Sequence, residues 1–114
     1  MPDLQLFISD FSPDILCITE TWLHEDISNG NLALNGYNII RKDRQNGTNA
    51  HGGVLIAVKT TYDFISLDHE SDHEVAFINL IINGTTLKIV VAYRPPSQTF
   101  IENQLFVHFL HDKL

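Results

Sequence analysis

Two β-rich runs joined by Asn83-Gly84 constrain the fold of this chain more than any other feature. Residues 75–82 and 87–93 consist mostly of Val, Ile, Leu, Phe and Ala. Asn-Gly supplies the positive φ angles that a tight hairpin turn requires. Pro95-Pro96 ends the second run, because proline cannot donate to a strand ladder. We therefore expect an antiparallel hairpin over residues 75–93.

Three further runs have the composition of strands. Residues 15–18 and 54–58 are apolar at every position, which is typical of strands covered on both faces. Residues 37–40 form the third run, which leads into the charged segment Arg41-Lys42-Asp43-Arg44. The sequence thus predicts five strands in all.

Helices are expected near both ends of the chain. The first has an apolar stripe of helical period that stops at Ser12-Pro13, and its members are Leu4, Phe7, Ile8 and Phe11. At the other end, Thr99 and Glu102 form a capping-box pattern. The apolar face predicted behind this cap contains Ile101, Leu105, Phe106, Phe109 and Leu110.

The composition fits one globular domain. The chain has 114 residues, of which 44% are hydrophobic and 18% charged, and it contains no internal repeat, linker or low-complexity tract. The chain contains seven Lys and Arg and fourteen Asp and Glu, which gives it a net charge of −7. No overall basic field is available to attract a polyphosphate, so nucleic-acid binding starts at a disadvantage.

Cysteine content and the N-terminal segment bear on the compartment. Cys17 is the only cysteine, which excludes an internal disulfide, and its apolar neighbours indicate a small buried side chain. The first residues lack the basic and apolar regions of a secretory signal, and no run of about 18 apolar residues exists. The sequence predicts an intracellular protein that is not secreted and has no membrane partner.

The histidines do not form a convincing metal site. His69-Glu70-Ser71-Asp72-His73 matches the zinc motif H-E-x-x-H, which needs a stable amphipathic helix. Here the string lies in an acidic stretch between β-rich segments and has no apolar residue between its histidines. We interpret it as a solvated loop. His108 and His111 are interpreted as surface residues, because no third ligand follows them.

Glu20 and Tyr93 are the stronger candidates for chemistry. Glu20 follows a buried strand, so the core fixes its backbone while its carboxylate, a suitable ligand for Mg²⁺, emerges at the strand end. An ordinary exposed Glu is the alternative. Tyr93 ends the last apolar run in the same way, and Arg94 after it favours an anion. Spacing alone does not show whether Glu20 and Tyr93 converge.

Four blocks, taken in order, carry a family resemblance. They are Pro-Asp-Ile-Leu-Cys-Ile-Thr-Glu-Thr-Trp-Leu at 13–23, Gly-Tyr followed by Arg-Lys-Asp-Arg at 36–44, His-Gly-Gly-Val-Leu-Ile at 51–56, and Val-Ala-Tyr-Arg-Pro-Pro-Ser at 91–97. Together they resemble the endonuclease/exonuclease/phosphatase superfamily. The nearest similarity is to the apurinic-endonuclease-like domain that precedes the reverse transcriptase in non-LTR (LINE-type) retrotransposons.

The resemblance implies a fold and a chemistry. The implied fold is α/β (α+β): a four-layer α/β sandwich of two facing sheets flanked by helices, of which this chain is expected to form part, with one mainly antiparallel sheet and flanking helices. The implied reaction is Mg²⁺-dependent cleavage of phosphodiester bonds, with DNA as the partner of the intact parent and no small-molecule cofactor. Glu20 matches the family's metal-binding glutamate, and Tyr93 matches the tyrosine that contacts the scissile phosphate. Arg94 lies in the same motif and is expected to bind substrate phosphate, while Thr21 and Trp22 are expected to support the Glu20 turn by packing.

The departures from the family pattern set a second group of expectations. The family's first strand and its second half, which carries further catalytic Asp, Asn and His residues, have no counterpart here, so residues 1–114 are expected to form one partial domain that is inactive alone. The missing half would then be a partner, and residues 54–58, 78–82 and 89–92 would expose an apolar sheet face. The alternatives are a non-catalytic remnant or protein-interaction module, and a phosphatase or different nuclease of the same superfamily.

Overall fold

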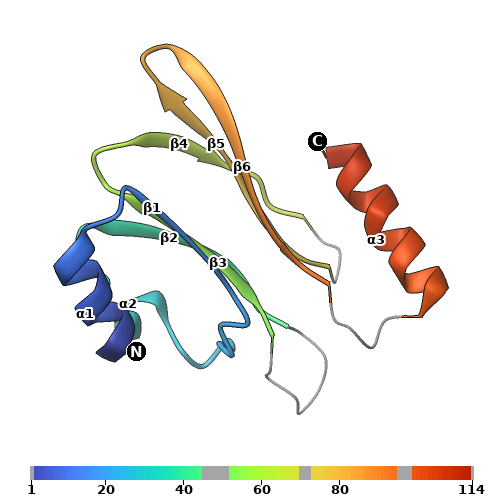
Figure 1. Cartoon of the computed structure of the whole chain (residues 1–114), viewed down its shortest axis with the longest axis horizontal. Helices are drawn as coiled ribbons and strands as arrows, with labels where there is room; N and C mark the ends of the chain where they lie inside the picture. Colours follow the sequence, from blue (N-terminus) through green and yellow to red (C-terminus); the bar gives the residue numbers. More distant parts are fainter. Residues whose placement is uncertain (1, 45–51, 70–72, 95–98, 114) are drawn as a thin grey trace.

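The computed structural model describes residues 2–44, 52–69, 73–94 and 99–113, and its helices and strands stack in four layers (Figure 1). In chain order the elements are α1 (Pro2–Phe11), β1 (Ile15–Thr19), α2 (Asn29–Leu32), β2 (Tyr37–Lys42), β3 (Val54–Lys59), β4 (Asp63–Ser66), β5 (Glu74–Ile82), β6 (Thr85–Tyr93) and α3 (Phe100–Lys113). None of the helices in these ranges is long and apolar enough to cross a membrane.

The strands form two antiparallel sheets of three strands each. Their orders are β1-β3-β2 and β4-β5-β6. Figure 1 shows α1 and α2 on the outer side of the first sheet and α3 on the outer side of the second. The predicted α+β class and layered arrangement are confirmed, with the difference that the strands divide between two facing sheets and do not form a single one.

Each interface between layers has its own apolar core. Val54, Ile56 and Val58 of β3 point between the sheets toward Ala76, Ile78 and Leu80 of β5. The alternate residues of β3, Leu55 and Ala57, pack under α1 and α2, while Val75 and Phe77 of β5 pack under α3. Because side chains alternate along a strand, burial on both sides explains why β3 is apolar at every position from Val54 to Val58.

The strand β1 is less covered than its sequence indicates. It is an edge strand, and Cys17 is exposed. The prediction of a buried Cys17 was therefore wrong, because an apolar run does not reveal that a strand lies at the edge of its sheet. Partial burial nevertheless raises the pKa of the Cys17 thiol.

The hairpin forms as predicted. Asn83 and Gly84 have φ angles of 50° and 78°, as a turn with two positive φ angles requires, and Ile82 pairs with Thr85 directly before it. The ladder continues to the pair of Glu74 and Tyr93 at the other end of the hairpin.

The predicted exposed apolar sheet face was wrong over most of its length. Residues 54–58 are fully buried, and so are Ile78 and Leu80. The two sheets cover each other between β3 and β5, and α1 and α2 cover the outer face of β3. Exposed apolar residues lie instead near the hairpin tip (Ile81, Ile82, Leu87), on the helices, and at Trp22 and Ile65.

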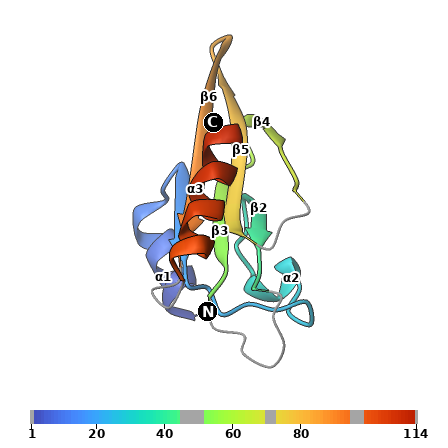
Figure 2. The same ribbon diagram turned by 90° about the vertical axis from the view of Figure 1, so that its right-hand side faces the viewer.

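The last helix begins with the predicted capping box. The Thr99 amide donates to Glu102 Oε1, and the Glu102 amide donates to Thr99 Oγ1, both at 3.2 Å. Figure 2 shows α3 lying along the second sheet. Of its predicted apolar face, Phe106, Phe109 and Leu110 pack on the sheet, whereas Ile101 and Leu105 are exposed.

Two elements were not predicted. The helix α2 has only four residues, and it is defined by its Ser28 cap and the burial of Leu32. The strand β4 also has four residues, and only Phe64 among them is half-buried. Its strand conformation is stabilised by pairing with β5. Neither is long enough to carry a periodic signal.

Candidate functional site

One end of the two-sheet sandwich gathers the candidate residues. At this end β1, β2 and β6 finish and β3 and β5 begin, as shown by the pairs Thr19 with Val54, Lys42 with Val54, and Glu74 with Tyr93. The ends of the two sheets lie next to each other in Figure 1. Polar residues that follow these strands therefore share one edge of the molecule.

Glu20 and Tyr93 meet at this edge. The Tyr93 hydroxyl donates a hydrogen bond of 3.0 Å to Glu20 Oε1, across the gap between the two sheets. The Tyr93 pKa is raised above its ordinary value, first by this hydrogen bond, then by partial desolvation and by the negative charge of Glu20. Arg94 directly follows Tyr93 and is exposed. The structure thus brings together two residues that spacing alone left separate.

The Glu20 turn has an unusual backbone. Glu20 and Trp22 have φ angles of 55° and 58°, in the left-handed region, which costs a residue with a side chain about 1–2 kcal/mol. Two backbone hydrogen bonds hold this turn, from the Thr21 amide to Gly53 O at 3.3 Å and from the Trp22 amide to Gly52 O at 2.8 Å. The strain is thus offset by bonds to the segment that precedes β3.

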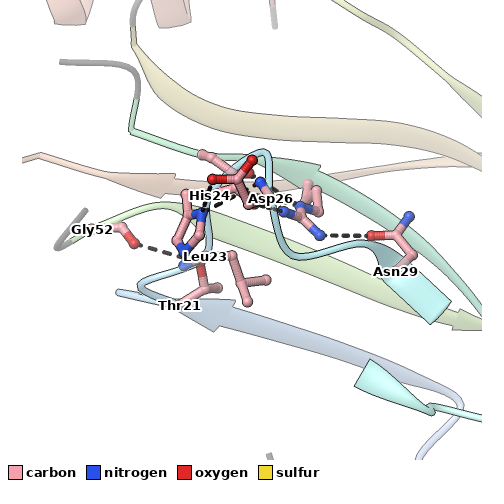
Figure 3. A network of polar contacts seen from close by, with 8 residues as sticks. Thr21, Leu23, His24, Asp26, Asn29 and Gly52 are labelled. Atoms are coloured by element: carbon pink, nitrogen blue, oxygen red, sulfur yellow. Dashed lines mark hydrogen bonds and ion pairs between the residues drawn. The ribbon is translucent and has the colours of Figure 1, made fainter. Parts of the chain in front are cut away.

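The two residues expected to support the turn behave differently. Thr21 is buried, and its hydroxyl donates to Gly52 O at 3.4 Å and accepts from the Leu23 amide at 3.3 Å (Figure 3). Trp22 is 57% exposed, and its described support for the turn is its backbone amide, which donates to Gly52 O at 2.8 Å.

Gly52 and Gly53 are required where they stand. Their φ angles are 111° and 89°. A Cβ on Gly52 would lie 2.4 Å from Glu74 Oε1, and a Cβ on Gly53 would lie 2.7 Å from Thr21 Oγ1. Both residues therefore need glycine for conformation and for space. In the sequence this pair carried little weight outside the family resemblance.

Sequence reasoning missed a buried ion pair beneath the site. Glu74 is 6% exposed, its Oε1 accepts a 2.6 Å hydrogen bond from the Gly53 amide, and its Oε2 accepts from Arg44 Nη2 at 3.2 Å and Nε at 3.3 Å. Glu74 pairs with Tyr93 in the hairpin, so it lies beside the site. The available signal was a Glu directly before the predicted strand at 75–82, 30 residues from its Arg.

A second arginine fixes the loop that follows the Glu20 turn. Arg41 donates to Asp43, with the shortest contact 2.8 Å from Nη2 to Oδ2, to Asn29 Oδ1 at 3.0 Å and to His24 O at 2.8 Å. Figure 3 shows this loop with His24, Asp26 and Asn29 against the sheet. The Arg41 side chain therefore has a structural role, because it joins β2 to this loop.

The histidine motif lies apart from this site. His69 Nε2 donates to Val75 O at 2.7 Å, and the His69 ring contacts Phe77 and Phe109, while the His73 ring contacts Phe106 and Phe109. Both histidines are half-buried under α3, so the solvated-loop interpretation was wrong for these two positions. The three residues between them lie outside the described residues.

The terminal-helix histidines agree with expectation. His108 and His111 are both exposed, as predicted for surface residues. Within the ranges that the structure describes, no three His, Cys, Asp or Glu residues lie close enough together to hold a metal ion.

The comparison with protein families agrees with this geometry. The sequence model of the endonuclease/exonuclease/phosphatase family matches residues 3–112. The chain belongs to this family. No curated protein matches the sequence.

Endonuclease/exonuclease/phosphatase family proteins typically use divalent metals, and the site contains one donor that suits Mg²⁺. Glu20 offers an exposed carboxylate, the hard oxygen donor that Mg²⁺ prefers. Glu74 does not add a second, because both its oxygens already accept hydrogen bonds in a buried position. Mg²⁺ commonly binds one or two carboxylates and completes its shell with water and substrate phosphate, so Glu20 fits a site that substrate completes.

Proposed function

We propose that this chain carries the metal- and phosphate-binding part of a Mg²⁺-dependent endonuclease domain from a retrotransposon-derived protein. The parent activity would be nicking of DNA to prime reverse transcription. The hydrogen bond between Tyr93 and Glu20 is the observation that carries the proposal, because it joins a carboxylate and a phenol from different sheets at one exposed edge. The order of the four sequence blocks supports the retrotransposon origin.

Each residue has a role that its position supports. Glu20 would hold the metal ion, which when bound polarises a phosphoryl oxygen. Tyr93 keeps its proton at neutral pH, and its pKa is raised further above the ordinary value. Its single hydroxyl hydrogen is donated to Glu20 Oε1 here and would pass to a phosphate oxygen once Glu20 holds the metal. Arg94, exposed beside it, would bind the neighbouring phosphate through its guanidinium group.

The same residues also limit what the chain does alone. Hydrolysis of a phosphodiester requires a group that takes a proton from the attacking water and a group that stabilises the developing charge. Glu20 is assigned to the metal, Tyr93 stays protonated, and Glu74 is neutralised by Arg44. We therefore propose that nicking needs further catalytic residues from the parent domain.

A plasmid-nicking assay tests this function. Supercoiled DNA and Mg²⁺ are incubated with the chain, with Glu20→Ala, and with the same pair extended by the parent reading frame. We expect no difference within the first pair and at least about a hundredfold loss for Glu20→Ala in the extended pair. Equal nicking by the extended protein and its Glu20→Ala variant would refute the metal role. Glu20-dependent nicking by the 114 residues alone would refute the need for further residues.

A second candidate is a non-catalytic interaction module. The exposed apolar residues of α3, which include Phe100, Ile101, Leu105 and Val107, are the observation in its favour. Under this alternative, substitution of Leu105 with Asp would abolish partner binding, while Glu20→Ala would leave it unchanged.

A further inference from the structure

The buried carboxylate of Glu74 makes no contact that the proposed reaction uses, yet it lies directly beneath the site. Burial of a charged group is costly unless the group is paired and hydrogen-bonded. Here both oxygens are engaged, one by the Gly53 amide at 2.6 Å and the other by two nitrogens of Arg44. Glu74 is buried while Arg44 is partly exposed, and such a pair contributes little net stability, so its place beside the site suggests a different role.

The contacts of Glu74 lead to Glu20 in two steps. Glu74 Oε1 fixes the Gly53 amide, and the carbonyl groups of Gly53 and Gly52 accept hydrogen bonds from Thr21 and Trp22. These two amides directly follow Glu20, whose φ of 55° is unfavourable for a residue with a side chain. The conformation that aims the Glu20 carboxylate thus depends on a glycine segment that Glu74 holds in place.

Arg44 completes the unit. Its side chain is 21% exposed, and its Nε and Nη2 both lie within 3.3 Å of Glu74 Oε2. A planar guanidinium group can make such a two-nitrogen contact, whereas an ammonium group makes only a point contact. Arg44 therefore sets the orientation of the Glu74 carboxylate as well as neutralising it.

We infer that Glu74, oriented by Arg44, is a positioning residue that fixes the Glu20 carboxylate for metal binding by way of Gly52 and Gly53. This inference rests on the proposed function, because it assigns Glu20 to the metal. Glu74 itself touches neither metal nor substrate in this account, since its two oxygens are already engaged.

The test uses the full chain and two readouts. The first is amide hydrogen exchange at Thr21 and Trp22, measured by NMR in wild type, Glu74→Gln and Arg44→Lys. The second is the affinity for Mn²⁺, measured by water-proton relaxation in the presence of a short DNA oligonucleotide. Asp14→Asn is the matched control, because it removes one acidic charge from an ion pair with Lys59 at the other end of β3.

We expect Glu74→Gln and Arg44→Lys to speed exchange at Thr21 and Trp22 while the β3 amides stay protected. We expect Mn²⁺ affinity to fall about 10- to 100-fold, the usual effect of removing a group that orients a metal ligand, and to change less than about twofold in Asp14→Asn. Arg44→Lys keeps the net charge, so it separates positioning from a simple field effect, and it replaces Glu74→Gln if that variant does not fold.

Two outcomes would overturn the inference. One is unchanged exchange at Thr21 and Trp22 in folded Glu74→Gln and Arg44→Lys. The other is faster exchange there with Mn²⁺ affinity unchanged, which would leave Glu74 a purely structural role. If wild type does not bind Mn²⁺ at all, the proposed function fails instead, and the exchange data still decide whether Glu74 controls the Glu20 turn.

Discussion

Substitution of Gly52 with Ala should destabilise the protein far more than an ordinary change in a loop. Gly52 has a φ of 111°, and an alanine there pays about 1–2 kcal/mol for the left-handed backbone. The new Cβ would lie 2.4 Å from Glu74 Oε1 and 2.6 Å from Arg44 Cζ. Both atoms are at the ends of flexible side chains, so the overlap is relieved by moving them away from Gly52.

That movement has its own cost. Glu74 is buried, and displacing it lengthens its 2.6 Å hydrogen bond from the Gly53 amide. Loss of a hydrogen bond to a charged group costs about 1.5–3 kcal/mol. The total for Gly52→Ala is therefore about 2.5–5 kcal/mol. With a urea m-value of about 1–3 kcal/mol/M, the unfolding midpoint should fall by at least about 0.8 M.

Gly36→Ala is the matched control for this experiment. Gly36 has a φ of 85°, and nothing lies within 4 Å of the position of its added Cβ. It should therefore lose only the backbone cost of about 1–2 kcal/mol. Urea unfolding of the two variants, followed by circular dichroism, compares them directly. Equal losses for Gly36→Ala and Gly52→Ala would refute the claim that Gly52 is packed against the buried ion pair.

Three further predictions concern α3 and the site. Phe106→Ala should cost about 3–5 kcal/mol in urea unfolding because Phe106 is 6% exposed, whereas Leu105→Ala, 58% exposed, should cost less than about 1 kcal/mol; similar losses would mean that α3 packs through another face. The chain should show no submicromolar zinc binding by calorimetry, because His69 is committed to Val75 O and to aromatic rings; tight binding lost in His69→Ala would contradict this. The raised pKa of Tyr93 means that the Tyr93–Glu20 bond is fully present below the ordinary tyrosine pKa of 10.0 and is lost as pH rises through the folded value; Glu20→Gln should lower the Tyr93 pKa in a spectroscopic titration, and an unchanged or higher value would count against the bond.

Elements with a strong local signal could be predicted from the sequence. The Asn83-Gly84 turn, the fully apolar run at 54–58 and the capping box of Thr99 and Glu102 each have a local cause, and all three are confirmed. Local patterns could not reveal which strands lie at an edge, so Cys17 was expected to be buried. They also could not separate the strands into two sheets, because that depends on which apolar faces meet.

The candidate site also contains residues that the sequence could identify and one that it could not. Glu20 and Tyr93 were identified from their positions after apolar strands and from the family resemblance, but their contact spans 73 residues and two sheets. Glu74 was missed because its importance shows only in the folded structure, where its buried carboxylate lies between the Gly53 amide and the Arg44 guanidinium group. No spacing rule links residues 44, 52–53 and 74.

The central claim is that Glu20 binds a divalent metal beside Tyr93 when a phosphodiester is present. Its most direct test is paramagnetic relaxation by Mn²⁺, added with a short DNA oligonucleotide to the isotopically labelled chain. The account predicts selective broadening of Tyr93 ring signals and of amides near Glu20, and loss of that broadening in Glu20→Gln. It predicts no comparable effect on the ring of Tyr62, which lies between β3 and β4 at the end of β3 opposite the site. Broadening centred on another part of the chain, or undiminished in Glu20→Gln, would contradict it.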